Sequence, residues 1–295
     1  MKIDVCICTY KREAICRAML SIDKQVLPSG AEMRLIVIDN DVEPTAKERV
    51  EATAAQMTVP VTYVHAPSHN ISIARNAGLD AVDADWIAIM DDDEHASPTW
   101  VRSLLGHAIE HDFDVVFGPA VARYPEGTPE WILARDYLST YPEPRNGEYR
   151  TGPTNNTLLR AASPHIAGRR FLLEKGRTGG EDTAFFFDVW RSGGTLGMCE
   201  KAVVYEDVDP ARLKFDWLRQ RKFRSGMTYG RSSLRTNHVV LKFGLVALAA
   251  VKSGYCLIRA AAAISSPADR NFWRLRGTFH KGVMSAFIGE EPELY

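Results

Sequence analysis

The chain has 295 residues, of which 45% are hydrophobic and 25% are charged. These values are those of an ordinary globular protein with a full core rather than a largely disordered chain, and the length allows one large α/β domain with additions or two smaller domains. The net charge of −1 conceals an asymmetry: residues 1–211 carry a balance of −11, whereas residues 212–281 hold 15 Lys and Arg against two Asp. A cationic C-terminal third indicates a phosphate-bearing ligand, an anionic membrane surface or nucleic acid.

The five cysteines indicate a reducing compartment. Their number is odd, no CxxC pair occurs, and Cys6 and Cys8 would share one face of a strand, which suits packing better than a disulfide. The first apolar run contains Asp4, so we see no signal peptide and expect reduced thiols in the cytosol.

Strands and helices are predicted to alternate through the first 95 residues. Short apolar runs predict strands, and apolar positions at helical spacing predict the first helix. The expected strands cover 2–8, 33–38, 61–64 and 86–90, separated by a helix over about 13–26, a helix that ends near 57 and a segment over 71–82. This alternation favours a mostly parallel, doubly wound sheet.

The strand over 86–90 ends in four acidic side chains, those of Asp91, Asp92, Asp93 and Glu94. Adjacent carboxylates repel one another unless a cation or solvent offsets them, and their oxygens suit Mg²⁺ or Mn²⁺. The alternative is a solvated acidic turn before a helix that starts near Ser97-Pro98.

Polar residues also follow the first two strands, at 9–12 and 39–41. Ligand crevices of open α/β sheets lie at the carboxyl ends of the strands, so these clusters should line one crevice together with the acidic residues. Neither GxGxxG nor GxxxxGK[ST] occurs. Phosphates would therefore be held by a metal and by basic side chains rather than by a glycine-rich loop.

The second half of the chain is less regular. The Pro-, Gly- and Tyr-rich stretch 124–153 is typical of a loop that faces an acceptor, and the basic, Gly-rich stretch 169–180 is typical of a mobile one. We expect strands at 114–121, within 152–159 and at 203–205, a helix over 183–191, and basic helices from residue 210 onward.

Several short motifs follow one another in order: VCICTYKR at 5–12, IDN at 38–40, ARNAG at 74–78, MDDDE at 90–94, GGED at 179–182 and RxxR at 221–224. Each motif alone is weak. In this order and at this spacing, over roughly residues 3–230, the sequence resembles family 2 glycosyltransferases. It is similar in particular to bacterial glucosyltransferases that assemble exopolysaccharides of the succinoglycan type.

The resemblance implies a GT-A fold, which is an α/β fold with a Rossmann-like mixed sheet, followed here by a basic helical C-terminal extension. The catalytic domain would cover 1–210, with a donor-binding part at 1–95 and an acceptor-binding part at 96–210. A helical basic region over 211–295 would follow, suited to membrane contact. A nucleotide-sugar donor, a Mg²⁺ or Mn²⁺ ion and an inverting transfer are also implied.

The same resemblance implies roles for individual residues. Asp93, five residues before Pro98, would ligate the metal, and Asp182 would be the catalytic base. A positioned carboxylate can take the proton of an acceptor hydroxyl, while a metal and nearby cations stabilise the leaving nucleoside diphosphate. The donor would be bound by Thr9, Tyr10, Arg12, Asp39, Arg75, Asp91, Asp92, Arg221 and Arg224.

Other interpretations of these residues stay open. Asp182 could cap a helix, since Gly-Glu-Asp-Thr is a fair helix start. Arg75 could pair with a surface acid, residues 9–12 could be a plain loop, and Arg221 and Arg224 could be solvated charges on a helix. Ser225 stands where the family often has a Trp after the distal Arg motif, which favours single-sugar transfer over processive synthesis.

A competing motif lies at His107-Ala-Ile-Glu110-His111, which matches the HxxEH pattern of inverted zinc peptidases. Leu104, Leu105 and the apolar residues at 108–109 favour an ordinary helix between two strands instead.

The stretch 239–264 is apolar but is interrupted by Lys242, Lys252 and Arg259. Because a spanning helix tolerates few charges, amphipathic helices on an anionic membrane surface fit the pattern better. Packing on the main domain or on a second subunit is the alternative.

We therefore predict a cytoplasmic, metal-dependent inverting glycosyltransferase, peripheral on the inner face of the membrane. It would move glucose from UDP-glucose to a lipid-linked or oligosaccharide acceptor in surface-polysaccharide biosynthesis. No nucleic-acid partner is expected, and a homo-oligomer is compatible with the sequence. A sugar-phosphate nucleotidyltransferase and a catalytically idle nucleotide-sugar-binding protein are the alternatives.

Overall fold

The computed structural model describes residues 1–233 and 239–287. Among these residues the chain forms two compact units. The first unit comprises residues 1–122 and 139–206, and the second comprises 123–138 together with the described residues from 207 onward. The division predicted at residue 210 stays a prediction, and each unit is described below by itself.

The first unit is built on a seven-stranded sheet with the strand order β3-β2-β1-β4-β8-β6-β9. The four strands of the N-terminal half are parallel, β8 runs antiparallel to β4 and β6, and β9 is parallel to β6. The mixed sheet predicted above is thereby confirmed. The strand bounds are β1 Lys2–Thr9, β2 Glu32–Asp39, β3 Val61–His65, β4 Trp86–Asp91, β6 Val115–Phe117, β8 Asn156–Arg160 and β9 Leu196–Met198.

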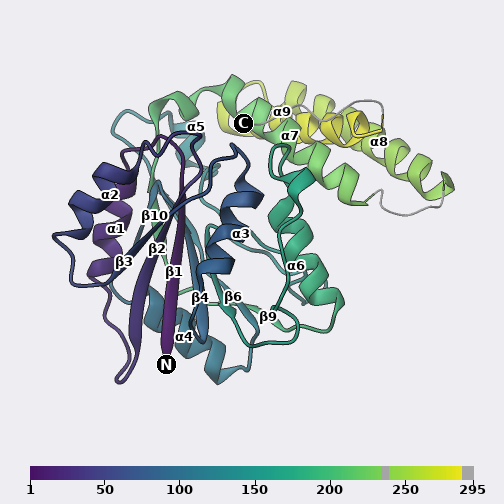
Figure 1. The fold of residues 1–295 in the computed structure, drawn as a ribbon. Helices are drawn as coiled ribbons and strands as arrows, with labels where there is room; N and C mark the ends of the chain where they lie inside the picture. The colour runs from purple at the N-terminus through teal and green to yellow at the C-terminus, as the bar shows by residue number, and fades with distance from the viewer. Residues whose placement is uncertain (234–238, 288–295) are drawn as a thin grey trace. The chain divides into compact units, whose positions relative to one another are not determined.

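Helices lie against both faces of this sheet (Figure 1), and buried side chains form a hydrophobic core on each face. Ile3, Val5 and Ile7 of β1 pack into the first core with α1 Ile15–Asp23, α2 Lys47–Ala54 and α4 Trp100–Glu110. Cys6 and the partly buried Cys8 pack with the second core, beside α3 Ile71–Ala81 and α6 Glu181–Arg191. The alternation along β1 is the period of two that a buried strand requires, and both cysteines are free thiols.

A small second sheet has the order β5-β10-β7, with bounds β5 Glu94–Ala96, β7 Ala120–Arg123 and β10 Val204–Asp207. The single strand predicted over 114–121 is therefore wrong, because β6 and β7 belong to different sheets. Gly118 lies at the break, where a Cβ atom would come within 2.3 Å of the Ala202 carbonyl oxygen. The chain turns between the sheets because only glycine permits this close approach.

The second unit is mostly helical, as predicted. Its helices are α5 Glu130–Leu133, α7 Phe215–Ser233, α8 Val239–Ala262 and α9 Pro267–Ser285. Gly226 of α7 and Gly282 of α9 let these helices approach closely, since a Cβ at either position would lie about 2 Å from a backbone oxygen of the other helix. Arg135 pairs with Asp269 at the start of α9, which ties the 123–138 segment to the helices.

Candidate active site

The polar residues that follow β1, β2 and β4 meet at one edge of the sheet. Thr9 pairs with Asp39 in the β1–β2 ladder, and Cys8 pairs with Asp91 in the β1–β4 ladder. The hydroxyl of Thr9 donates to a carboxylate oxygen of Asp92 at 2.7 Å. Residues 9–12 are thus bonded directly to the acidic segment, as expected for a shared crevice.

The four acidic residues occupy different environments. Asp91 ends β4, Asp92 and Asp93 form the turn, and Glu94 begins β5. Glu94 is buried and accepts hydrogen bonds from the Asn155 amide at 2.6 Å and from the Asp91 backbone N–H at 3.2 Å. The segment is therefore a tight connection between two strands rather than a solvated turn before a helix.

Arg12 is the cation that faces this turn. Its guanidinium lies 2.9 Å from Asp92 and 2.6 Å from Asp93. Asp92 is buried, whereas the Asp93 side chain is 22% exposed. Asp93 is therefore the turn carboxylate that an incoming cation reaches most easily.

Burial raises the pKa of two carboxylates in this cluster. The pKa of Asp91 is raised to about 7 by burial, Asp93 and Asp92 add to the rise, and Arg75 opposes it. Burial, followed by the charge of Asp91, also raises the pKa of Glu94. Carboxylates held in this way gain from a divalent ion with an oxygen-preferring shell, so the donor set fits Mg²⁺ or Mn²⁺.

Asp39 and Tyr10 lie beside this cluster. The Asp39 side chain is fully buried and accepts hydrogen bonds from the backbone N–H groups of Asp41 and Ala46 and from the Tyr63 hydroxyl. Asp39 thus organises the loop between β2 and α2, and its nucleobase contact stays a prediction. Tyr10 stacks on His69 with ring centroids 4.6 Å apart, which supplies an aromatic wall that the motif alone did not predict.

Arg75 connects the donor side of the crevice to the second acidic site. From α3 its guanidinium reaches Glu181 at the start of α6, with 2.5 Å between Nη1 and Oε1. The charge of Arg75 also acts on both Asp91 and Asp182. The predicted binding residue and the predicted base are therefore neighbours, and Arg75 does not pair with a surface acid.

Asp182 lies in the first turn of α6. Burial raises its pKa to about 6, Glu181 adds to the rise, and Arg75 and Thr183 oppose it. The N-cap residue of the helix is Gly180, whose φ of 84° is left-handed, and the Asp182 carboxylate accepts hydrogen bonds from the backbone N–H and the hydroxyl of Thr183. Asp182 is therefore not the N-cap residue itself, although its carboxylate satisfies a first-turn N–H and favours the helix dipole.

The connection that delivers this acidic pair is anchored on α3. The N-cap residue Asn70 donates to the Leu173 carbonyl, and Asn76 exchanges two hydrogen bonds with the backbone of Phe171. Gly176 packs against Asn70 so tightly that a Cβ there would lie 1.8 Å from the Asn70 Oδ1 atom. The stretch predicted as mobile is thus bonded along its first half to the helix that carries Arg75.

Arg221 and Arg224 belong to the second unit, in α7. The Arg221 guanidinium lies over the Trp217 ring at 5.5 Å from its centroid. Their contact with a diphosphate or an acceptor stays a prediction. Sequence reasoning missed Glu181 and Asn155 as partners of the site, because each is identified only by the residue it contacts across the fold.

Comparison with known proteins identifies the family to which this chain is similar. The model of the family "Glycosyl transferase family 2" matches residues 4–177. The succinoglycan biosynthesis protein ExoM of Rhizobium meliloti (strain 1021) is 40% identical over 100% of this chain and 96% of its own length.

Solved structures agree at the level of the fold. S. aureus TarS 1–349 in complex with UDP has a TM-score of 0.55 and 19% identity over 97% of this chain and 91% of that one. A second TarS structure has the same TM-score and 16% identity over 97% of this chain, which spans only 55% of the longer TarS chain. With the mixed sheet and the two acidic sites, these matches show that the chain belongs to glycosyltransferase family 2 and is a glycosyltransferase with the GT-A fold.

Proposed function

We propose that this glycosyltransferase moves glucose, with inversion, from UDP-glucose to a lipid-linked or oligosaccharide acceptor in surface-polysaccharide biosynthesis. The acceptor class is suggested by the likeness to a protein named for succinoglycan biosynthesis. The choice of UDP is suggested by TarS, a protein of the same fold that was solved with UDP.

One observation carries this proposal: two acidic sites of different character flank the same arginine. Asp182 has a pKa raised to about 6, so it is mostly ionised at neutral pH while remaining a stronger base than a free aspartate. That balance suits a group that takes the proton of an acceptor hydroxyl as the glycosidic bond forms. The acidic turn of residues 91–94 instead suits the metal-diphosphate end of the donor.

In the proposed site a bound Mg²⁺ or Mn²⁺ would be held by Asp93, with Asp91 nearby, and would offset the charge of the diphosphate. Arg12 would exchange its contact with Asp93 for one with the donor. Thr9 would keep Asp92 in place through the hydrogen bond already described, and Tyr10 would lie along the nucleoside. Inversion follows if Asp182 and the leaving group face opposite sides of the sugar.

The decisive experiment is an assay of purified protein with UDP-glucose, Mn²⁺ and a lipid-linked oligosaccharide acceptor. We expect release of UDP, with transfer lost in Asp182→Asn while UDP-glucose binding is retained. Full transfer by Asp182→Asn would contradict the assignment of the base. Release of pyrophosphate from a nucleoside triphosphate and sugar phosphate would favour the nucleotidyltransferase, and donor binding without turnover across an acceptor panel would favour the idle binding protein.

We further propose that α8 lies on the anionic inner surface of the cell membrane. Ala249, Ser253 and Cys256 on one side of α8 are buried, whereas Val251 and Ile258 on another side are each 70% exposed. Residues Lys242–Ala262 are long and apolar enough to cross a membrane, and 22% of this stretch is buried within the protein. Lys242, Lys252 and Arg259 interrupt this apolar stretch, which favours a helix that lies along the membrane surface over one that crosses the membrane.

A further inference from the structure

We propose that the last turn of α4 binds a divalent transition-metal ion, such as Zn²⁺, through His107, Glu110 and His111. The site is distinct from the acidic turn that the proposed glycosyl transfer uses. It lies beside β9, the last strand of the seven-stranded sheet, and two strands, β8 and β6, separate β9 from β4.

The helix brings the three ligands together because residues three and four positions apart lie on one face. One ligand atom from each of His107, Glu110 and His111 lies within 4.8 Å of the others, and the two imidazole rings are 4.4 Å apart between centroids. Within residues 1–233 and 239–287 this is the one group of three or more His, Cys, Asp or Glu side chains that converges so closely. His107 is partly buried, and Glu110 and His111 are exposed, so the latter two side chains can rotate toward an ion beside His107.

His107 packs between His111 and Phe113, with ring centroids 4.4 Å from His111 and 5.7 Å from Phe113. It lines the same pocket as Met198 of β9.

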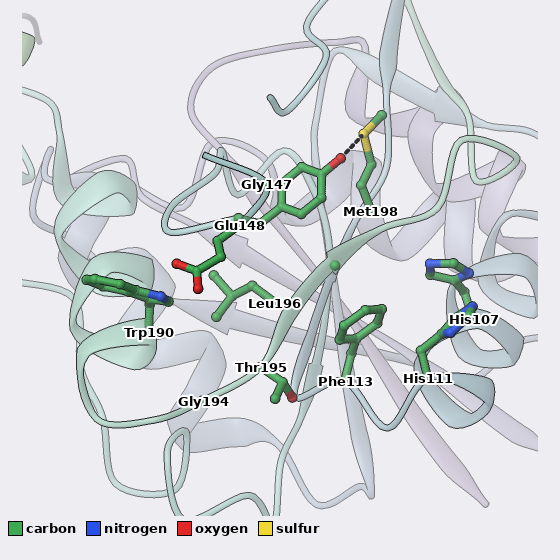
Figure 2. A pocket seen from close by; sticks show the side chains of 12 residues that line it. His107, His111, Phe113, Gly147, Glu148, Trp190, Gly194, Thr195, Leu196 and Met198 are labelled. Carbon is green, nitrogen blue, oxygen red and sulfur yellow. Dashed lines mark hydrogen bonds between the residues drawn. The ribbon is translucent and has the colours of Figure 1, made fainter. Parts of the chain in front are cut away.

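Two of the three ligands, His107 and His111, line a pocket of about 480 Å³. Figure 2 shows His107 and His111 at one end of the pocket next to Phe113, with Glu148 and Trp190 at the other end. Three protein ligands leave at least one coordination position on a tetrahedral ion. That position would be open to water or to a small anionic or hydroxylated ligand in the pocket.

The ligand chemistry separates this site from the donor site. Two imidazoles and one carboxylate suit Zn²⁺, Co²⁺ or Ni²⁺, whereas an all-carboxylate turn suits Mg²⁺ or Mn²⁺. Glu110 acts here as a ligand, so the inference requires no peptidase reaction from the HxxEH pattern.

Calorimetric titration of the metal-free full chain with Zn²⁺ tests the inference. We expect one equivalent to bind, with affinity at least about tenfold weaker in His107→Ala and in His111→Ala, and no binding at this site in the double variant. His165→Ala, which removes another partly exposed histidine, should bind Zn²⁺ like the unmodified protein. Asp93→Asn should do the same.

The absorption spectrum of bound Co²⁺ reports coordination directly and separates it from a loss of folding. Circular dichroism without metal verifies that each variant is folded. Unchanged Zn²⁺ affinity in the folded double variant would overturn the inference, as would no binding by the unmodified protein. Mn²⁺-dependent UDP-glucose binding should be unaffected in His107→Ala. A failure of that donor binding in the unmodified protein would contradict the proposed function and leave the zinc result standing.

Discussion

The Arg75 guanidinium and the Glu181 carboxylate form an ion pair in which both side chains are less than a tenth exposed. The pair joins α3 to α6, and the charge of Arg75 also reaches Asp91 and Asp182. An arginine held in this way fixes the separation between the acidic turn and the proposed base. We therefore propose that the pair positions the acidic turn and the proposed base relative to one another.

We expect Glu181→Ala to lower the free energy of unfolding by about 3–5 kcal/mol, because it leaves the Arg75 charge buried without its partner. Urea denaturation measures this loss. Replacing both residues, as Arg75→Met with Glu181→Leu, should restore part of the stability because the ion pair is removed as a whole, although Asp91 and Asp182 then lose the charge of Arg75. Transfer activity should stay low in the double variant, and its recovery would show that the pair has a structural role only.

The proposed base should give a pH dependence with a definite direction. Because the pKa of Asp182 is raised to about 6 from an ordinary value of 3.8, its ionisation disfavours the folded state, and its contribution to stability falls as pH rises from about 4 through 6. Activity should change in the opposite direction, since the base must be ionised. We expect kcat/KM to rise with pH through about 6.

Glu181→Gln should move this limb to lower pH. The substitution removes the like charge of Glu181 that adds to the raised pKa of Asp182, and the charge of Arg75 still opposes the rise. Asp188→Asn, farther along α6, is a matched control that should leave the limb in place. An unchanged limb in Glu181→Gln would assign it to another group.

The metal should compete with Arg12 for the acidic turn. Arg12→Ala removes the cation that contacts Asp92 and Asp93, so Mn²⁺ should bind the free protein more tightly. Because the Arg12 side chain is about half exposed, the gain should be no more than about fivefold. Lys11→Ala is the control, since Lys11 pairs with Asp41 instead. Electron paramagnetic resonance of free Mn²⁺ measures the affinity, and weaker binding in Arg12→Ala would contradict the competition.

Much of this architecture was predictable from local pattern, and the exceptions share a cause. The strands β1 and β4 have continuous buried runs, and the clusters at Thr9 and Asp91 follow directly from where those runs end. The strands β5 and β9 have three residues each, too few to show a period. Glu181 resembles any acid at a helix start until the fold places it against Arg75, so its pairing depends on tertiary contact alone.

Asn155 should be required for the acidic turn to fold. Its amide donates to the buried carboxylate of Glu94 at 2.6 Å, and Asn155→Ala would leave that oxygen unsatisfied. We expect a loss of about 1–3 kcal/mol in the free energy of unfolding, measured in urea. Asn155→Asp should destabilise more strongly, because it places a second carboxylate beside one whose pKa is already raised. Equal stability of both variants and the unmodified protein would show that this contact is not formed in solution.

The exposed side of α8 should determine membrane binding. Val251 and Ile258 lie seven residues apart, two turns along one side of the helix, and both are largely exposed. Replacing both residues with Asp removes roughly 3 kcal/mol of apolar burial in a bilayer surface, which weakens partitioning roughly a hundredfold.

Flotation with vesicles containing anionic lipid at low salt measures this partitioning. Leu133→Asp on α5, also an exposed apolar position, is the matched control. Transfer to a soluble oligosaccharide should persist in the α8 variant, since its substitutions lie outside the donor site. If the unmodified protein does not float with the vesicles, the proposal that α8 binds membranes is wrong. Packing of the exposed side of α8 on another protein surface would then be the better explanation.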